Sequence, residues 1–256
     1  MAWYNIVSVA AMLLAFVAGV MLVLKFAVIP PRIKTLLLDA DGTLLDFDRS
    51  EKAALQETFE ALGYPFDEAA YASYHKNNAA CWKMLERREI TREELKVRRY
   101  RMTFEELGID GDPVLTTKTY EGNLGKYGFA FDGVEEACEK LAKKYDLYIV
   151  TNGLKNVQTS RMLKTRIPQV VKGIYISEDV GYDKPAAEFF EKIFAEHPEM
   201  KRKTTMIVGD SLSGDIQGGI NAGILTCWVN RTGASRPEEM AIDLEIDDIV
   251  KLEKEL

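Results

Sequence analysis

The chain has 256 residues and a formal net charge of −7, and no block of like charge occurs along it. A nucleic acid polymer is therefore not expected as a partner, because phosphate backbones are bound by basic surfaces. The three cysteines form no CxxC pair, so neither a zinc site nor a disulfide framework is expected.

The first predicted element is an N-terminal membrane anchor in residues 1–30. Residues 6–24 carry no charged side chain, and about 20 apolar residues cross a bilayer as a helix. Lys25 and Arg32 follow this run, and no Lys or Arg precedes it, which favours a cytoplasmic C-terminal side. We therefore expect a single-pass membrane protein whose remaining domain faces the cytoplasm. The alternatives are a buried core helix, or a soluble cytoplasmic protein whose translation starts near Ile33.

Strand and helix patterns alternate through most of the remaining chain. Apolar runs predict buried strands over 33–38, 147–150, 173–176, 205–208 and 224–229. Amphipathic patterns predict helices over 134–144, 154–164, 186–196 and 215–221. This alternation indicates a parallel sheet with right-handed crossovers. We predict an α/β fold with a Rossmann-like parallel-sheet core formed by residues 31–47 and 128–256.

Residues 48–127 interrupt the alternation after the first strand. They contain no convincing strand and predict several amphipathic helices, among them 50–62, 68–86 and 92–107. Glycines and a predicted Gly111-Asp112-Pro113 turn separate the later segments. An all-helical insert of this length predicts a separate cap domain over residues 48–127.

Polar residues follow several of the predicted strands. Asp39 and Asp41 end the first strand, and residues i and i+2 of an extended chain point to the same side. Thr151 and Asn152 follow the second strand, and Asp210 follows a later one. Two further members of the group are Asp215, five residues beyond Asp210, and Lys184, in a loop before a predicted helix. Because open parallel sheets bind ligands at the carboxyl edge, these side chains predict one site.

The charges of this group indicate its chemistry. Four converging aspartates cannot all stay ionised without compensation. Mg²⁺ suits a few carboxylates together with substrate phosphate and water, and Lys184 adds a fixed positive charge. An aspartate has a reference pKa of about 3.9 and is already ionised near neutral pH, so Asp39 can attack phosphorus and form an aspartyl-phosphate. Asp41 can give a proton to the leaving oxygen and later take one from water.

These residues resemble the four motifs of the haloacid dehalogenase-like hydrolases, in order, from residue 33 to about 230. The resemblance implies that Asp39 is the nucleophile and a Mg²⁺ ligand, and that Asp41 is the acid/base, with its backbone carbonyl on the metal. It also implies that the phosphate is held by Thr151, Asn152 and Lys184, and the metal by Asp210 and Asp215. The helical insert matches the helical cap of this family.

A finer resemblance links the chain to the noncanonical pyrimidine 5′-nucleotidases of that family. It is carried by Asn78 and Trp82, by Arg99-Tyr100 and by the run 218–230. It implies pyrimidine nucleoside 5′-monophosphates as substrates, with Asn78 and Arg99 as binding residues, although cap core or surface is an equal interpretation of these positions. Members of this subfamily resemble soluble proteins and lack an apolar N-terminal segment like residues 1–30.

Three other functions are open at this point. The first is a phosphatase for another small metabolite, such as phosphoglycolate or a sugar phosphate. The second is a haloacid dehalogenase, which needs neither Mg²⁺ nor an acid/base and would leave Asp41 unexplained. The third is a catalytically inactive, membrane-tethered binding protein, against which the intact set of acidic residues and Lys184 argues.

Overall fold

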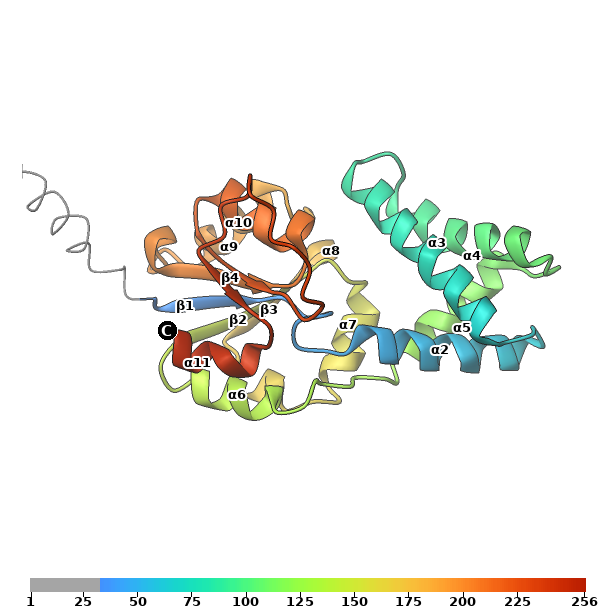
Figure 1. Ribbon diagram of the computed structural model, residues 1–256, viewed down its shortest axis with the longest axis horizontal. Helices are drawn as coiled ribbons and strands as arrows, with labels where there is room; N and C mark the ends of the chain where they lie inside the picture. Colours follow the sequence, from blue (N-terminus) through green and yellow to red (C-terminus); the bar gives the residue numbers. More distant parts are fainter. Residues whose placement is uncertain (1–32) are drawn as a thin grey trace, which may run out of the picture. The chain divides into compact units, whose positions relative to one another are not determined.

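The computed structural model describes residues 33–256, which form one compact unit. Six parallel strands build one sheet in the order β3-β2-β1-β4-β5-β6 (Figure 1). The strands are β1 (Thr35–Leu38), β2 (Asp146–Thr151), β3 (Gly173–Ile176), β4 (Thr205–Gly209), β5 (Leu225–Val229) and β6 (Leu244–Ile246). The predicted α/β class and its five strands are confirmed. The sequence analysis missed β6, because three residues are too few to show a periodicity.

The predicted membrane localisation is corrected by the structure. No helix within residues 33–256 is long and apolar enough to cross a lipid bilayer. The run 6–24, on which the prediction of a single-pass membrane protein rested, lies outside the described residues. We therefore remove the membrane localisation and the lipid bilayer from the expected properties of the chain.

Strand β1 lies at the centre of the sheet and is buried along its whole length. It pairs with β2 on one side and with β4 on the other, so that Leu38 stands beside both Ile149 and Val208. The chain builds the β2–β3 side first and then crosses β1 to build the other side. A crevice forms beyond the carboxyl ends of the strands at such a switch point, and β1 delivers Asp39 to this place.

Helices cover both faces of the sheet (Figure 1). Leu36 and Leu38 pack into the apolar cluster under α6 (Val134–Leu141) and α11 (Leu252–Glu255), whereas Leu37 packs against α9 (Ala187–Glu196). Because successive strand residues point to opposite faces, this all-apolar strand is buried on both sides. The other elements of this part are α7 (Lys155–Met162), α8 (Ser177–Val180), α10 (Gln217–Ala222), a π-helix (Leu212–Ile216) and the 3₁₀ turns Ile167–Gln169, Arg202–Thr204 and Ile249–Lys251.

The helical insert between β1 and β2 contains α2 (Phe47–Leu62), α3 (Glu68–Glu86), α4 (Arg92–Leu107) and α5 (Pro113–Leu124). The first three were among the predicted helices, whereas α5 was not named: the sequence analysis placed a turn at Gly111-Asp112-Pro113 and took glycines as breaks between the segments. The start of α5 explains the error: the Asp112 carboxylate accepts hydrogen bonds from the amides of Val114 and Leu115, and Pro113 occupies the first turn. Asp and Pro at these positions begin a helix as readily as a turn. The division into cap and core domains stays a prediction.

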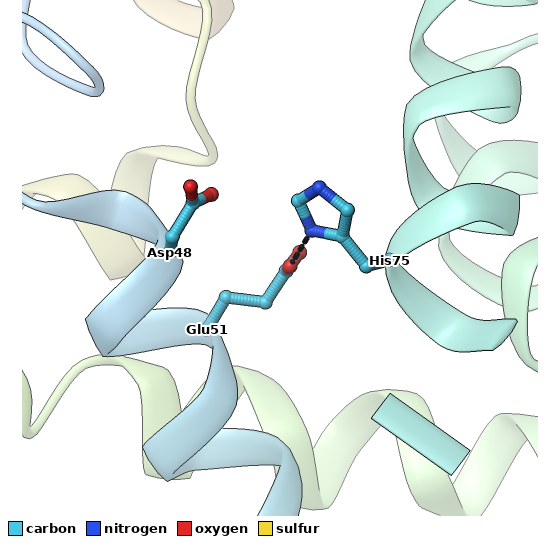
Figure 2. Close-up of side chains that lie close together, drawn as sticks. All are labelled: Asp48, Glu51 and His75. Atoms are coloured by element: carbon cyan, nitrogen blue, oxygen red, sulfur yellow. Dashed lines mark hydrogen bonds and ion pairs between the residues drawn. The ribbon is translucent and has the colours of Figure 1, made fainter. Parts of the chain in front are cut away.

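A buried carboxylate joins α2 to α3. Glu51 of α2 is fully buried, and its Oε2 lies 2.6 Å from Nδ1 of His75 on α3 (Figure 2). Its Oε1 accepts a hydrogen bond of 2.7 Å from Nδ2 of Asn78. A buried charge is costly unless it is paired and hydrogen-bonded, so Glu51 holds these two helices in one register.

The pH dependence of stability tests this link. The hydrogen bond to Glu51 raises the pKa of His75, against the opposing effect of partial burial. The resulting stabilisation is fully present below the unfolded pKa of about 6.5 and is lost as pH rises through the higher folded pKa. We expect His75→Gln to lower the free energy of unfolding at about pH 5.5 and to change it little at about pH 9, as measured by urea unfolding.

Glu51→Gln supplies the control background, since it keeps the shape of the side chain and removes its charge. In that background His75→Gln should have the same effect at both pH values. An equal loss at both pH values in the otherwise unchanged protein would contradict the role of the Glu51 charge.

Candidate active site

Three carboxylates meet at the carboxyl edge of the sheet. Asp39 follows β1, Asp210 follows β4, and Asp215 lies in the π-helix beyond it. Each offers an oxygen within 4.8 Å of the oxygens of the other two. The structure therefore brings together three of the four aspartates that were expected to converge. The fourth, Asp41, lines the same cavity, but its side chain bonds to α7.

Lys184 is buried within this group. Its Nζ donates hydrogen bonds to Asp39 Oδ1 at 2.6 Å, to Asp215 Oδ1 at 2.5 Å and to the carbonyl of Val150 at 2.9 Å. The side chain of Asn152 fixes the backbone of Lys184, because its Oδ1 accepts from the Lys184 amide at 2.8 Å and its Nδ2 donates to the Lys184 carbonyl at 2.7 Å. Asn152, for which a phosphate contact was predicted, thus holds the backbone from which the Lys184 side chain extends.

The cluster holds more negative charge than Lys184 can balance. Burial raises the pKa of Asp39 well above its ordinary value, Asp215 and Asp210 raise it further, and Lys184 opposes them. Burial, followed by the charge of Asp215, raises the pKa of Asp210 to about 7. Three carboxylates facing one ammonium favour a further divalent cation, and all-oxygen donors suit Mg²⁺.

Gly42 allows β1 and β4 to bring these carboxylates together. It has a φ of +84°, and a Cβ atom there would lie 2.5 Å from Oδ2 of Asp210. Any other residue would be strained in this turn and would push Asp210 away. Thr43, which the sequence analysis did not single out, steadies Asp210: its hydroxyl donates to Asp210 Oδ1 at 3.2 Å and accepts from the Asp210 amide at 3.0 Å.

Two residues of α7 hold Asp41. Arg161 Nη1 donates to Asp41 Oδ1 at 2.5 Å, and Gln158 Nε2 donates to Asp41 Oδ2 at 2.7 Å. Gln158 Nε2 also donates to the hydroxyl of Thr151 at 2.8 Å, which joins two residues predicted for the site. The sequence analysis missed both α7 residues. Their spacing of three places them on one helix face, but an exposed polar face gives the same pattern.

The insert supplies the opposite wall of the site. A cavity of about 270 Å³ lies over Asp39, Asp210 and Asp215. Its wall on the insert side consists of Phe47, Trp82, Glu86, Arg99, Tyr120 and Leu124. Asn78, predicted to bind substrate together with Arg99, is buried behind Arg99 and does not line the cavity. Its Oδ1 accepts a hydrogen bond of 3.1 Å from Arg99 Nη1.

Arg92 of α4 connects the insert to the loops of the core. Its Nη1 donates to the Asn152 carbonyl and its Nη2 to the hydroxyl of Ser177, both at 2.9 Å. Arg92 also forms an ion pair with Asp183, which precedes Lys184. The insert therefore contacts the same two loops that position Lys184.

Residues 36–229 match the family model of the haloacid dehalogenase-like hydrolases. The chain belongs to this family. The predicted family and the prediction of an enzyme are thereby confirmed. The roles that the resemblance implies for single side chains of this hydrolase stay predictions, because similarity over a whole chain assigns no role to one residue.

Several relatives of this haloacid dehalogenase-like hydrolase resemble it over most of their length. The HAD-hydrolase YfnB of Bacillus subtilis is 36% identical over 199 residues, covering 78% of this chain and 85% of the relative. A crystal structure of YfnB bound to magnesium has a TM-score of 0.84 and 34% identity, covering 88% of this chain and 99% of that one. The pyrimidine 5′-nucleotidase PynA of Streptococcus pneumoniae is 37% identical over 77% of this chain and 84% of the relative. The pyrimidine 5′-nucleotidase YjjG of Escherichia coli is 27% identical over 86% and 96%.

The raised pKa of Asp210 predicts how the metal-free hydrolase responds to pH. A carboxyl group whose folded pKa lies above its unfolded value stabilises the fold when protonated, and this contribution is lost as pH rises through about 7. Asp210→Asn is uncharged at every pH. We expect this variant to be more stable than the wild type in EDTA at about pH 8, and to lose most of the stabilisation that MgCl₂ gives the wild type.

Thermal unfolding at about pH 5 and about pH 8, with EDTA or with MgCl₂, measures both effects. The matched control is Asp132→Asn, which removes an exposed carboxylate and should change neither. If Asp210→Asn were less stable than the wild type in EDTA at about pH 8, the inferred excess of negative charge in the acidic cluster would be contradicted.

Proposed function

We propose that this protein is a Mg²⁺-dependent phosphatase that hydrolyses phosphate monoesters through an aspartyl-phosphate on Asp39. The observation that carries the proposal is the contact of the Lys184 ammonium with Asp39 and Asp215 at the end of the central strand. A carboxylate in this position can attack phosphorus while the ammonium and a neighbouring cation offset the charge of the phosphoryl oxygens. The membership in the haloacid dehalogenase-like hydrolases supports the same chemistry.

The cavity residues have separate roles in the proposed reaction. Asp39 attacks the phosphorus atom, and Asp41 protonates the leaving oxygen and then deprotonates the attacking water. Thr151, Lys184 and the backbone of Asn152 hold the phosphate. Mg²⁺ would be held by carboxylates of Asp39 and Asp210, by the carbonyl of Asp41 and, through water, by Asp215. When bound, the cation neutralises negative charge on the phosphoryl group.

We further propose pyrimidine nucleoside 5′-monophosphates as the substrates. PynA and YjjG, which are named pyrimidine 5′-nucleotidases, are similar to this chain over most of their length. The insert places three aromatic side chains, Phe47, Trp82 and Tyr120, and one buried cation, Arg99, in the wall of the cavity. Small-molecule sites are typically lined by apolar and aromatic side chains with a few placed polar groups, and an aromatic side chain can stack on a planar base.

Replacement of the nucleophile tests the mechanism. Asp39→Asn keeps the shape of the side chain and removes the attacking charge, so we expect phosphatase activity to fall by several orders of magnitude. The fold should survive, because the substitution relieves repulsion in the acidic cluster. Phosphate release and circular dichroism measure the two outcomes. EDTA should abolish wild-type activity and MgCl₂ should restore it, whereas full phosphate release in metal-free buffer would contradict the Mg²⁺ requirement. Halide release from a haloacid in metal-free buffer would instead favour dehalogenase chemistry.

A substrate panel tests the specificity. We expect kcat/KM to be higher for uridine and cytidine 5′-monophosphates than for adenosine and guanosine 5′-monophosphates, because binding energy from the leaving group is expressed in the transition state. Phosphoglycolate and sugar phosphates belong in the same panel. Equal rates on purine nucleotides, or a preference for a sugar phosphate, would contradict the proposed pyrimidine specificity. The proposed substrate would then be another small phosphate monoester.

A further inference from the structure

Two hydrogen-bond donors in the insert wall of the cavity have no protein acceptor within hydrogen-bond distance among the described residues. They are Nη2 of Arg99 and the hydroxyl of Tyr120, both buried. Leaving a buried donor unsatisfied costs about 1–3 kcal/mol, and most such groups in folded proteins are paired. Both residues line the cavity above the acidic cluster, which makes a group bound in the cavity a candidate acceptor for both donors.

The remaining contacts of Arg99 fix the direction of its free nitrogen. Nη1 donates to Oδ1 of Asn78. The guanidinium carbon lies 5.1 Å from the ring centres of Tyr100 and Tyr120 and 5.9 Å from that of Tyr74. Three aromatic rings and one amide thus hold a planar cation, so Nη2 is preorganised as a donor rather than free to turn to solvent.

The nitrogens of Arg99 other than Nη2 already have acceptors: Nη1 donates to Asn78, and Nε donates to the carbonyl of Lys96 at 3.4 Å. Asn78 in turn donates through Nδ2 to the buried carboxylate of Glu51, which also pairs with His75 and so offsets the charge of Arg99 only in part. With one free nitrogen, Arg99 cannot hold a carboxylate or a phosphate through two parallel hydrogen bonds. The subsite therefore favours a neutral acceptor, such as a carbonyl oxygen, over a carboxylate or a second phosphate.

We propose that Arg99 and Tyr120 form a two-donor subsite that binds a neutral carbonyl oxygen on the ring of the substrate's leaving group, and that Asn78 and Glu51 are positioning residues for Arg99. This inference rests on the proposed phosphatase function and deepens it. A pyrimidine base carries such a carbonyl on a ring flat enough to lie along Trp82 and Phe47, which line the same cavity. An adenine base carries none.

The hydroxyls of two neighbouring tyrosines provide a matched test. Tyr120→Phe removes the hydroxyl of the subsite. Tyr100→Phe removes an equally buried hydroxyl that faces Tyr74 at 3.4 Å and belongs to a residue that does not line the cavity. We expect Tyr120→Phe to lower the ratio of kcat/KM for uridine 5′-monophosphate to that for ribose 5-phosphate, which lacks the base, by about threefold to tenfold. Tyr100→Phe should leave this ratio unchanged.

Binding of uridine, measured by calorimetry on the full chain, tests the subsite without turnover. Its dissociation constant should rise by the same factor of about threefold to tenfold in Tyr120→Phe and stay unchanged in Tyr100→Phe. Equal effects of the two substitutions, or no binding of uridine to the wild type, would overturn the subsite even if phosphatase activity is found. Normal uridine binding in a protein that releases no phosphate would instead refute the proposed reaction and keep the subsite.

Discussion

The ion triad of Lys184, Asp39 and Asp215 is the contact on which the arrangement of the site depends. A buried ammonium and two buried carboxylates are stable only where geometry and additional hydrogen bonds compensate for lost hydration. Here the carbonyl of Val150 supplies a third acceptor, and Asn152 holds the lysine backbone from both sides. The triad joins the ends of β1 and β2 to the loop before α9, and it leaves Asp210 at its edge with charge still to be balanced.

Helix α7 contacts both the acidic site of the core and the helical insert. One side of it presents Gln158 and Arg161 to Asp41. Another side places Val157 in the same apolar cluster as Tyr120 and Leu124 of α5. Arg92 adds a second connection, from α4 to the Asn152 loop. Asp41, the Asn152 loop and the insert wall of the cavity are therefore held by elements that contact one another directly.

Much of the core could be predicted because its signals are local. An apolar run of four to six residues ending in Asp39 or Asp210 shows both a buried strand and its polar end within a few residues. The same reasoning failed where the local signal has two solutions. Asp112-Pro113 begins α5 but also suits a turn, and β6 is too short to show a pattern. The membrane prediction rested on the hydropathy of residues 6–24 and on the basic residues that follow them, and this run lies outside the described residues.

By itself, the sequence determined that carboxylates and a lysine would stand at the carboxyl edge of a parallel sheet, because the position of a side chain along a strand follows from covalent spacing. Only the tertiary structure decided what each side chain faces. It turned Asp41 toward Arg161, placed Asn78 behind Arg99 and brought Tyr120 into the cavity wall. These outcomes depend on contacts between helices whose residues lie more than 20 positions apart in the chain. The side-chain periodicity of one helix shows which of its residues share a face, but it does not show which other helix that face contacts.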